Sequence, residues 1–580
     1  MRRVLLHAPR CMQRAPPTVV RGASFSVSRS MSSLSSSSSS SSCTSAAAAP
    51  AIALTPSEAQ LFDFLLYIQH LYAPTTQLRV AGGWVRDKLR GAESEDIDIV
   101  LDNLYGRQFA GLITRFQRER RLPLSSVGVV KANADKSKHL EVAQVKVHGL
   151  LVDLVHLRAE SYTQQSRIPT HTSFVAPQED ALRRDITINA LFYNLHTRQV
   201  EDWTGRGLDD LRAGVIRTPL APLQTFLDDP LRVLRVIRFA AEFGFRVDAA
   251  IDAALRQHRD IHDAMRRKVS RERVGTEARK MLSGADPTRA FALLADLELL
   301  DVVFHSDDAA LDGSTSVVDA DTAARWRRRF VWTPEHVERA ASHLAHLQAS
   351  RLATHQHAVS FVEATAAVLA PFLRPAGHTR ARVQPVLAAL PGEHWADDVT
   401  EELLLATALR HLATRDEIVA SLPLDDVVEL LKTNLKWPKP AAKRIARILE
   451  ALATFPASDG ESAPPSAAAI GVELFLWSRR YHDVLSPAIA ILLTELPEPE
   501  RAALVATLDA STHALAKADA RERQLDGQAI RARLGGQAGR AIAVALEVLS
   551  VWEFVRPDGS KDDELAFLDR LQPHLTHAKQ

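Results

Sequence analysis

The sequence predicts an α+β fold: a mixed sheet with helices in the N-terminal part of the chain, followed by a part built of helices alone. Between residues 56 and 200, segments with helical spacing of apolar residues are interspersed with short segments in which apolar and polar residues alternate. From residue 288 to residue 580 the chain is rich in Ala, Leu and Arg, and its periodicity is helical. Both cysteines lie before residue 44, which excludes disulfides and cysteine-bound zinc from the fold.

The elements follow from the same patterns. Thr55 and Pro56 are expected to start a helix that runs to Tyr72, because a threonine N-cap before a first-turn proline is a common helix start. A second helix is expected over residues 105–121. Strands are expected over residues 77–81, 96–100, 125–130, 139–147 and 150–155. This order favours a mixed sheet with helices on one face.

The N-terminal segment is excluded from the fold. The first 57 residues contain six arginines and no lysine, aspartate or glutamate, and residues 35–42 are all serine. This composition is typical of a mitochondrial transit peptide, and a disordered basic tail is the alternative. We therefore expect a mitochondrial protein. Translation from Met12 or Met31 would shorten the leader and give cytosolic or nuclear forms.

Gly82 and Gly83 lie between an expected strand and a helical segment. Two glycines allow a tight turn and a close approach of the backbone to a ligand, and the free N–H groups of a helix start favour phosphate. Asp96 and Asp98 follow in a strand, where residues i and i+2 lie on one face. Two carboxylates on one face are suitable ligands for Mg²⁺. Each feature alone is common on protein surfaces, so the prediction rests on their combination.

In this order and spacing, Gly82-Gly83-Trp84-Val85-Arg86-Asp87 followed by Asp96-Ile97-Asp98 resembles motif A of the class II nucleotidyltransferases in the DNA polymerase beta superfamily. This class holds the tRNA CCA-adding enzymes and the bacterial poly(A) polymerases. The resemblance implies a polymerase-beta-like nucleotidyltransferase domain. In that domain Asp96 and Asp98 would bind two Mg²⁺ ions, while Gly83 and Arg86 would contact phosphates.

A second motif, Arg-Arg-Asp-Ile-Thr-Ile-Asn-Ala, spans residues 183–190. Adjacent guanidinium groups donate hydrogen bonds in pairs and are suited to bind a triphosphate. The segment resembles motif B of the family, which implies that Arg183, Arg184, Asp185 and Asn189 bind the ribose and the phosphates. A salt-bridge cluster at a helix start is the alternative.

Arg232, Arg235 and Arg238 recur every three residues after Asp229, so they are expected on one face of a helix. The segment resembles motif D, in which an Asp and an Arg read the incoming base, and here Asp229 and Arg232 match. A carboxylate beside a guanidinium complements the Watson–Crick edges of cytosine and adenine. Guanine and uracil would leave polar groups unpaired, at a cost of about 1–3 kcal/mol each. Arg235 and Arg238 are expected to bind phosphates or to brace the reading pair.

Two further sets of residues are weaker candidates. Glu141, in an expected strand, is the candidate for a third catalytic carboxylate. Asp153 in the next strand is the competing candidate, and a structural role for Glu141 is equally compatible with the pattern. Glu272, Arg273 and Glu277 match motif E of the family, and we expect them to brace the neighbouring helices.

Together, the motifs imply template-independent addition of CCA to the 3′ end of tRNA from CTP and ATP. The reaction would release pyrophosphate by two-metal phosphoryl transfer to the tRNA 3′-OH. A poly(A) polymerase, or an enzyme that adds only CC or only A, shares the same motifs and stays an alternative. The alternative that is not an enzyme is a catalytically inactive RNA-binding protein with the same fold.

Four parts are expected: a leader over residues 1–55, a nucleotidyltransferase head over 56–200, a helical neck that reads the base over 201–300, and a helical body and tail over 301–580. The body and tail are expected to bind the acceptor–TΨC half of tRNA by its shape. A basic patch over residues 432–447, which includes Trp437, is interpreted as an RNA contact or, equally, as a solvated face. We expect a monomer and no membrane span, since no run of 18 apolar residues occurs.

Overall fold

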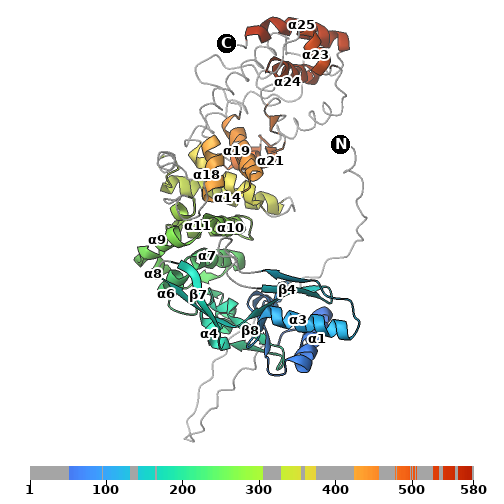
Figure 1. Ribbon diagram of the computed structural model, residues 1–580. Helices are drawn as coiled ribbons and strands as arrows, with labels where there is room; N and C mark the ends of the chain where they lie inside the picture. The colour runs from blue at the N-terminus through green and yellow to red at the C-terminus, as the bar shows by residue number, and fades with distance from the viewer. Residues whose placement is uncertain are drawn as a thin grey trace, which may run out of the picture. The chain divides into compact units, whose positions relative to one another are not determined.

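The computed structural model describes residues 51–94, 96–130, 142–163, 166–304, 328, 330–353, 359–373, 424–455, 477, 480–481, 483–494, 496, 498, 501–502, 504–505, 525, 527–534, 540–555 and 560–577. They are the coloured ribbon of Figure 1. The chain divides into two units, Met1–Ala49 and Pro50–Gln580, and every described residue belongs to the second. Residues 1–50 of the expected leader and Glu141 lie outside the described residues.

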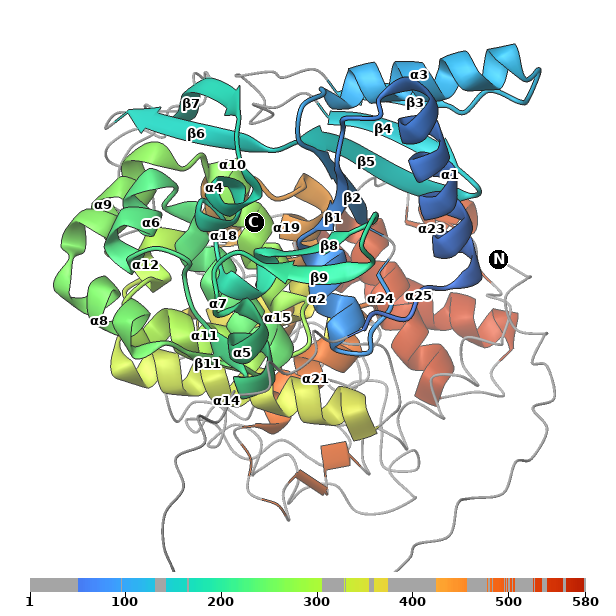
Figure 2. The same cartoon turned by 90° about the horizontal axis from the view of Figure 1, so that it is seen from below.

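Seven strands form a mixed sheet in the order β3-β4-β5-β2-β1-β8-β9. Neighbours are antiparallel except β2 and β5, which run parallel. Figure 2 shows the central strands from below. The strands are β1 (Leu78–Ala81), β2 (Ile97–Leu101), β3 (Val127–Val130), β4 (Val142–Val147), β5 (Leu150–His156), β8 (Leu191–Asn194) and β9 (Gln199–Asp202). The strands expected before residue 156 are confirmed; β8 and β9 were not expected.

Helices cover one face of this sheet, as expected. The helices α1 (Pro56–Tyr72), α2 (Gly83–Leu89) and α3 (Gly106–Glu119) share one apolar core with Ile97, Ile99 and Leu154. The alternation along β2 and β5 therefore turns Asp98 and Asp153 to the opposite face. Thr55 caps α1 with Glu58 in a capping box, which confirms the helix start read from the sequence.

A hairpin of β6 (Arg158–Thr163) and β7 (Ser166–Phe174) follows β5 and forms a separate two-stranded sheet. Figure 2 shows it leaving the seven-stranded sheet where β5 ends. The sequence did not predict this hairpin, because residues 158–174 are largely polar and include Pro169. Such a segment lacks the apolar alternation by which strands are recognised.

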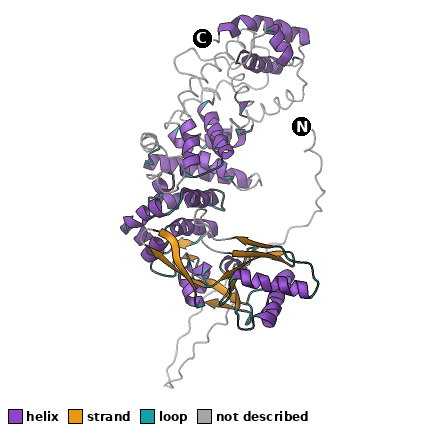
Figure 3. Ribbon diagram, viewed as in Figure 1, coloured by secondary structure: helices purple, strands orange, loops and turns teal. Residues whose placement is uncertain are grey.

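The chain beyond the sheet is helical, and the α+β fold class is confirmed. In the described part of the chain the last strand is β11, and Figure 3 shows only helices after it. The further elements are α4 (Pro177–Leu182), η2 (Thr187–Asn189), α5 (Gly207–Ala213), β10 (Val215–Ile216), α6 (Pro222–Asp228), α7 (Leu231–Phe243), β11 (Arg246–Val247), α8 (Ala249–Gln257), α9 (Arg259–Lys268), α10 (Arg271–Leu282), α11 (Pro287–Asp296), α12 (Leu300–Phe304), α14 (Pro334–Ala353), α15 (Phe361–Leu369), η3 (Ala370–Phe372), α18 (Leu424–Asn434), α19 (Lys439–Ala453), α21 (Leu485–Leu493), α23 (Gly527–Arg533), α24 (Arg540–Val555) and α25 (Lys561–His577). None of the described helices is both long and apolar enough to cross a membrane.

Helix α10 is held closely against the end of α18. A Cβ atom added to Gly275 would lie 1.8 Å from the carbonyl oxygen of Leu435, so only glycine fits there. Trp437 donates from Nε1 to the Gly275 carbonyl at 3.0 Å. The buried Arg271 donates to the carbonyls of Asn434 and Val302 at 2.7 and 2.8 Å. These contacts fix the helix that carries Arg273 and Glu277.

Candidate active site

Three carboxylates meet on the open face of the sheet. Asp98 on β2 lies opposite Asp153 on the parallel strand β5, and Asp96 immediately precedes β2. One carboxylate oxygen from each of the three lies within 4.8 Å of the others. In the described part of the chain, this is the one cluster of three or more acidic, histidine or cysteine side chains close enough to share a metal ion.

The electrostatics of this cluster favour a bound cation. Burial raises the pKa of Asp98 to about 6; the charges of Asp96 and Asp153 act in the same direction, and Arg184 opposes them. The site therefore holds negative charge that its own surroundings do not compensate. Three carboxylates are hard oxygen ligands of the kind that Mg²⁺ prefers, so the residues present fit this ion.

The cluster opens into a cleft of about 870 Å³. Its lining joins residues from the sheet, from α2, from the segment 183–185 that follows α4, from α7 and from α10. The predicted site residues that line it are Gly83, Arg86, Asp96, Asp98, Arg183, Arg184, Asp185, Asn189, Asp229, Arg232, Arg235, Arg238, Glu272, Arg273 and Glu277. Asp153, the competing candidate for the third carboxylate, belongs to the carboxylate cluster but not to this lining. Side chains more than 150 residues apart in the sequence thus share one cavity.

The glycine turn lies at one side of the cleft. Gly82 has a φ of +75° and is the N-cap of α2, so it is Gly82 rather than Gly83 that needs the freedom of glycine. Arg86 is buried, donates to the Asn189 side chain at 2.5 Å and pairs with Asp87 at 2.7 Å. Its guanidinium also lies 4.7 Å from the centre of the Phe243 ring. Arg86 therefore links the turn, the second motif and α7.

The adjacent arginines share one buried carboxylate that the sequence analysis did not single out. Arg183 donates to Asp180 Oδ1 at 2.9 Å, and Arg184 donates to Asp180 Oδ2 at 3.0 Å. Although burial opposes ionisation, these two cations lower the pKa of Asp180 to about 2. The sequence does contain a signal for these contacts. Asp180 precedes Arg183 by three residues and Arg184 by four, and side chains at these spacings are neighbours on a helix. Asp180 fixes both guanidinium groups at the wall of the cleft.

Asp185 is the centre of a similar network. Arg235 donates to its Oδ2 at 2.7 Å, and Asn189 and the Ile186 amide donate to its Oδ1 at 3.2 and 2.9 Å. Burial opposes ionisation of Asp185, but Arg235 outweighs it and lowers the pKa to about 2. Arg235 is thus the partner of a carboxylate of the second motif, a bracing contact between the sheet and α7.

The pair expected to read the base is held by other groups. Arg273 donates to both oxygens of Asp229, at 3.0 and 3.4 Å, and it is the main reason that the pKa of Asp229 is lowered despite burial. Arg232 donates to the carbonyls of Thr225 at 3.2 Å and Arg183 at 2.5 Å. Both side chains are therefore set in place before any nucleotide arrives.

Arg238, the last of the three arginines on one face of α7, is also paired. Arg238 donates to Glu277 at 2.7 Å and to Glu242 at 3.0 Å. Arg235 and Arg238, which were expected to bind phosphates or to brace the reading pair, thus both have carboxylates of the protein as partners. Glu277 is buried and connects α10 to α7, while Glu272 lines the cleft.

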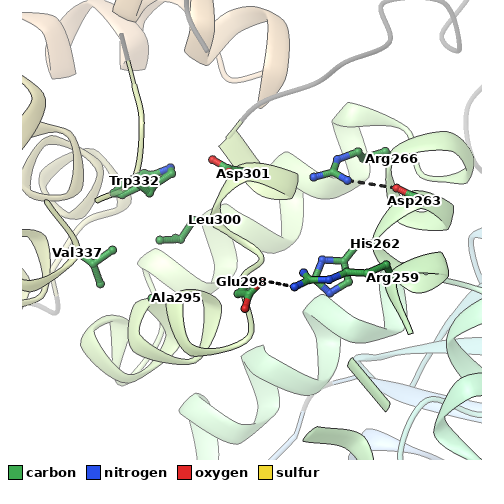
Figure 4. Close-up of a pocket in the computed structure, with 10 residues that line it drawn as sticks. All are labelled: Arg259, His262, Asp263, Arg266, Ala295, Glu298, Leu300, Asp301, Trp332 and Val337. Carbon is green, nitrogen blue, oxygen red and sulfur yellow. Dashed lines mark hydrogen bonds and ion pairs between the residues drawn. The ribbon is translucent and has the colours of Figure 1, made fainter. Parts of the chain in front are cut away.

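A second cavity, of about 320 Å³, lies between α9, α12 and α14 and contains no predicted site residue. Figure 4 shows that its charged side chains face one another: Arg259 pairs with Glu298 at 2.5 Å, and Arg266 pairs with Asp263 at 3.4 Å. Because these charges are already compensated, this cavity offers no strong attraction for a phosphate.

The basic patch is only partly available to a ligand. Trp437 is buried, so the interpretation of its ring as an RNA contact is wrong; its nitrogen bonds to Gly275 instead. Lys432 pairs with Glu429 at 2.7 Å, and Arg447 pairs with Asp483 at 2.8 Å. Lys439 and Lys443 are exposed on α19.

Two segments match known families. Residues 78–217 match the family described as the poly(A) polymerase head domain. Residues 244–311 match the one described as the probable RNA and SrmB-binding site of polymerase A. The first segment contains the strands that carry all three carboxylates, and the second contains α10.

Curated relatives match less than half of the chain. A mitochondrial CCA tRNA nucleotidyltransferase of Saccharomyces cerevisiae is 45% identical over 275 residues, which cover 45% of this chain and 50% of the relative. The tRNA nucleotidyltransferase cca2 of Schizosaccharomyces pombe is 47% identical over 225 residues, covering 38% of this chain and 46% of the relative. The chain thus spans about half the length of these curated relatives.

The fold is shared with a solved structure. A Thermotoga maritima CCA-adding enzyme complexed with tRNA aligns with a TM-score of 0.52 over 89% of this chain and 95% of that chain, at 17% identity. This likeness shows a shared fold. Residues 78–217 and 244–311 resemble the head domain and the RNA-binding site of poly(A) polymerases, a resemblance that agrees with the motifs.

Proposed function

We propose that this protein adds C, C and A to the 3′ end of tRNA without a template, using CTP and ATP. The observation that carries the proposal is the cluster of Asp96, Asp98 and Asp153, of which Asp96 and Asp98 line a cleft that Arg184 and Asp229 also line. An acidic metal site beside phosphate-binding and base-reading groups is what nucleotidyl transfer needs. The names of the yeast relatives support the same activity.

The carboxylate cluster would hold Mg²⁺. Of the two candidates for the third acidic group, we propose Asp153, because its carboxylate lies within the cluster. When bound, two Mg²⁺ ions would lower the charge on the triphosphate and favour ionisation of the attacking hydroxyl. Arg183 and Arg184, already oriented by Asp180, supply guanidinium donors to the phosphates.

Base selection follows from the geometry around Asp229. A carboxylate offers about four lone-pair positions, and on Asp229 the Arg273 guanidinium and the Leu231 amide occupy three of them. Asp229 can therefore still accept from the amino group of cytosine or adenine, while Arg232 donates to the ring nitrogen. Asp185 and Asn189 would orient the ribose. Arg273 and backbone carbonyls already hold Asp229 and Arg232 in place. These two side chains therefore lose little conformational entropy when a nucleotide binds.

The decisive experiment is nucleotide addition to tRNA transcripts that end at the discriminator base. Each NTP is supplied alone, and CTP and ATP are then supplied together. We expect three added residues, C-C-A, that depend on both nucleotides and are lost in the variant Asp96→Ala/Asp98→Ala. Open-ended A addition without CTP would identify a poly(A) polymerase, and addition of CC or A alone a partial enzyme. Binding of tRNA without release of pyrophosphate would leave an inactive RNA-binding protein.

We further propose mitochondrial import of the chain. The arginine-rich, acid-free leader supports this location, and so does the mitochondrial relative of Saccharomyces cerevisiae. The division into head (56–200), neck (201–300) and body with tail (301–580) is our proposal too, with the body and tail contacting tRNA. N-terminal sequencing of the protein from mitochondria and cytosol would show whether Met12 or Met31 starts a second form.

A further inference from the structure

Three aromatic rings gather where the hairpin leaves the sheet. Tyr105 lies 5.0 Å from the His156 ring and 4.9 Å from the Phe174 ring, and His156 lies 5.3 Å from Phe174, measured between ring centres. His156 is buried beneath the other two. Tyr105 is 41% exposed and Phe174 is 38% exposed. Large rings are usually buried, so an exposed pair that is supported from below resembles a binding surface rather than a core.

The backbone holds this group rigidly. His156 is the last residue of β5, and Tyr105 is the N-cap of α3. The first residue of α3, Gly106, is pressed against β5: a Cβ there would lie 1.9 Å from the Leu154 carbonyl oxygen. Phe174 ends β7, where it pairs with Arg158. Three elements therefore fix the three rings relative to one another.

The rings are continuous with the catalytic cleft, on the side away from the base-reading residues. His156 and Arg158 line the cleft together with the carboxylates. In the sheet, the carboxylates lie on β2 and β5, the glycine turn follows β1 on one side, and β4 lies on the other. The incoming nucleotide would occupy the side of β1 and α7. The nucleotide that presents its 3′-OH to the carboxylates must then approach from the side of β5.

We propose that Tyr105 and Phe174, supported by His156, form a stacking surface for the unpaired 3′-terminal base of the RNA primer. This inference rests on the proposed function and names a subsite within it. An aromatic face binds any base, since every base has a π-face, and so it tolerates the change of terminal residue during addition. Arg158 beside the rings supplies a positive charge on the path of the primer backbone.

The test uses the full-length protein and tRNA transcripts. The variants Tyr105→Leu and Phe174→Leu keep an apolar side chain and remove the ring. Loss of one stacking contact should raise the KM for the primer roughly 10-fold, with kcat and the KM for CTP unchanged. The variants Tyr105→Phe and Phe174→Tyr should retain the low KM. Tyr67→Leu is the matched control, because Tyr67 is a ring on α1 that is 45% exposed. This variant should leave the KM for the primer, the KM for CTP and kcat unchanged.

A second measurement separates this inference from the proposed activity. A tRNA transcript that carries 2-aminopurine as its last nucleotide is titrated with the Asp98→Ala protein, which needs no turnover. Stacking should quench the probe, and the Leu variants should lose this quenching. Quenching unchanged in the Leu variants would overturn the proposal, even if the protein adds CCA. An equal rise in the KM for primer and for CTP, with a lowered Tm, would also overturn it, because the rings would then be structural.

Discussion

Replacing Asp98 by asparagine should stabilise the metal-free protein. The pKa of Asp98 is raised to about 6, so the folded state penalises its ionised form. Against an unfolded value of about 3.9, and at about 1.4 kcal/mol per pKa unit, the penalty is about 3 kcal/mol at most. Since an asparagine side chain would keep the shape but lose the charge, we expect Asp98→Asn to gain about 1–3 kcal/mol in the free energy of unfolding at pH 8.

The gain has a defined pH dependence. Below about pH 4 the carboxyl is protonated in both the folded and the unfolded state, so the substitution gains nothing from charge. As the pH rises from about 4 through 6, the wild type loses stability relative to the variant, and above this window the difference is constant. Binding of Mg²⁺ needs the ionised carboxylate, so the apparent affinity of the wild type for Mg²⁺ should fall below pH 6.

The assay is urea unfolding at pH 4 and pH 8 in EDTA, repeated at pH 8 with Mg²⁺. Added Mg²⁺ should stabilise the wild type and leave Asp98→Asn unchanged, because only the wild type keeps the full ligand set. Asp209→Asn, which removes a carboxylate that is 78% exposed and lies outside the cluster, is the control: it should be as stable as the wild type in EDTA and gain as much stability from Mg²⁺. Equal or lower stability of Asp98→Asn at pH 8 in EDTA would refute the reasoning.

Two further predictions concern α10. Arg273→Ala removes the bidentate partner of the partly buried Asp229 and should lower kcat/KM for CTP and ATP at least about 10-fold, or about 1.4 kcal/mol. Arg273→Lys should recover part of this loss, and unchanged kinetics for the Ala variant would contradict the assigned contact. Gly275→Ala should destabilise the protein by more than about 3 kcal/mol in urea unfolding, because its Cβ would meet the Leu435 carbonyl at 1.8 Å. Gly111→Ala, inside α3 with nothing within 4 Å of the new Cβ, should instead stabilise it by about 0.5–1 kcal/mol, and equal effects of the two substitutions would refute this reading.

Local patterns were sufficient for much of the site. The pair Asp96 and Asp98 was found because strand periodicity places them on one face, and the glycine turn because it lies between a strand and a helix shortly before this pair. Helix α1 was predicted with its cap, since Thr55 and Pro56 act within a few residues. These features depend on interactions between neighbours in the chain.

Other features depend on segments that meet only after folding. Asp153 joins the carboxylate cluster because β5 pairs in parallel with β2, a register that no local pattern contains. Trp437 was misread as an RNA contact because its burial depends on α10, more than 150 residues earlier. The hairpin of β6 and β7 was missed because its polar sequence carries no apolar alternation.

The sequence by itself determined the fold class and the residues of the four motifs, because each is expressed in short-range spacing and residue type. Only the tertiary structure decided which partner each charge has: Asp180 for the paired arginines, Arg273 for Asp229, and Glu277 for Arg238. It also brought the rings of Tyr105, His156 and Phe174 together beside the cleft. The physical reason is that charge pairing, burial and ring contacts depend on distances in space, which strand register and helix packing set.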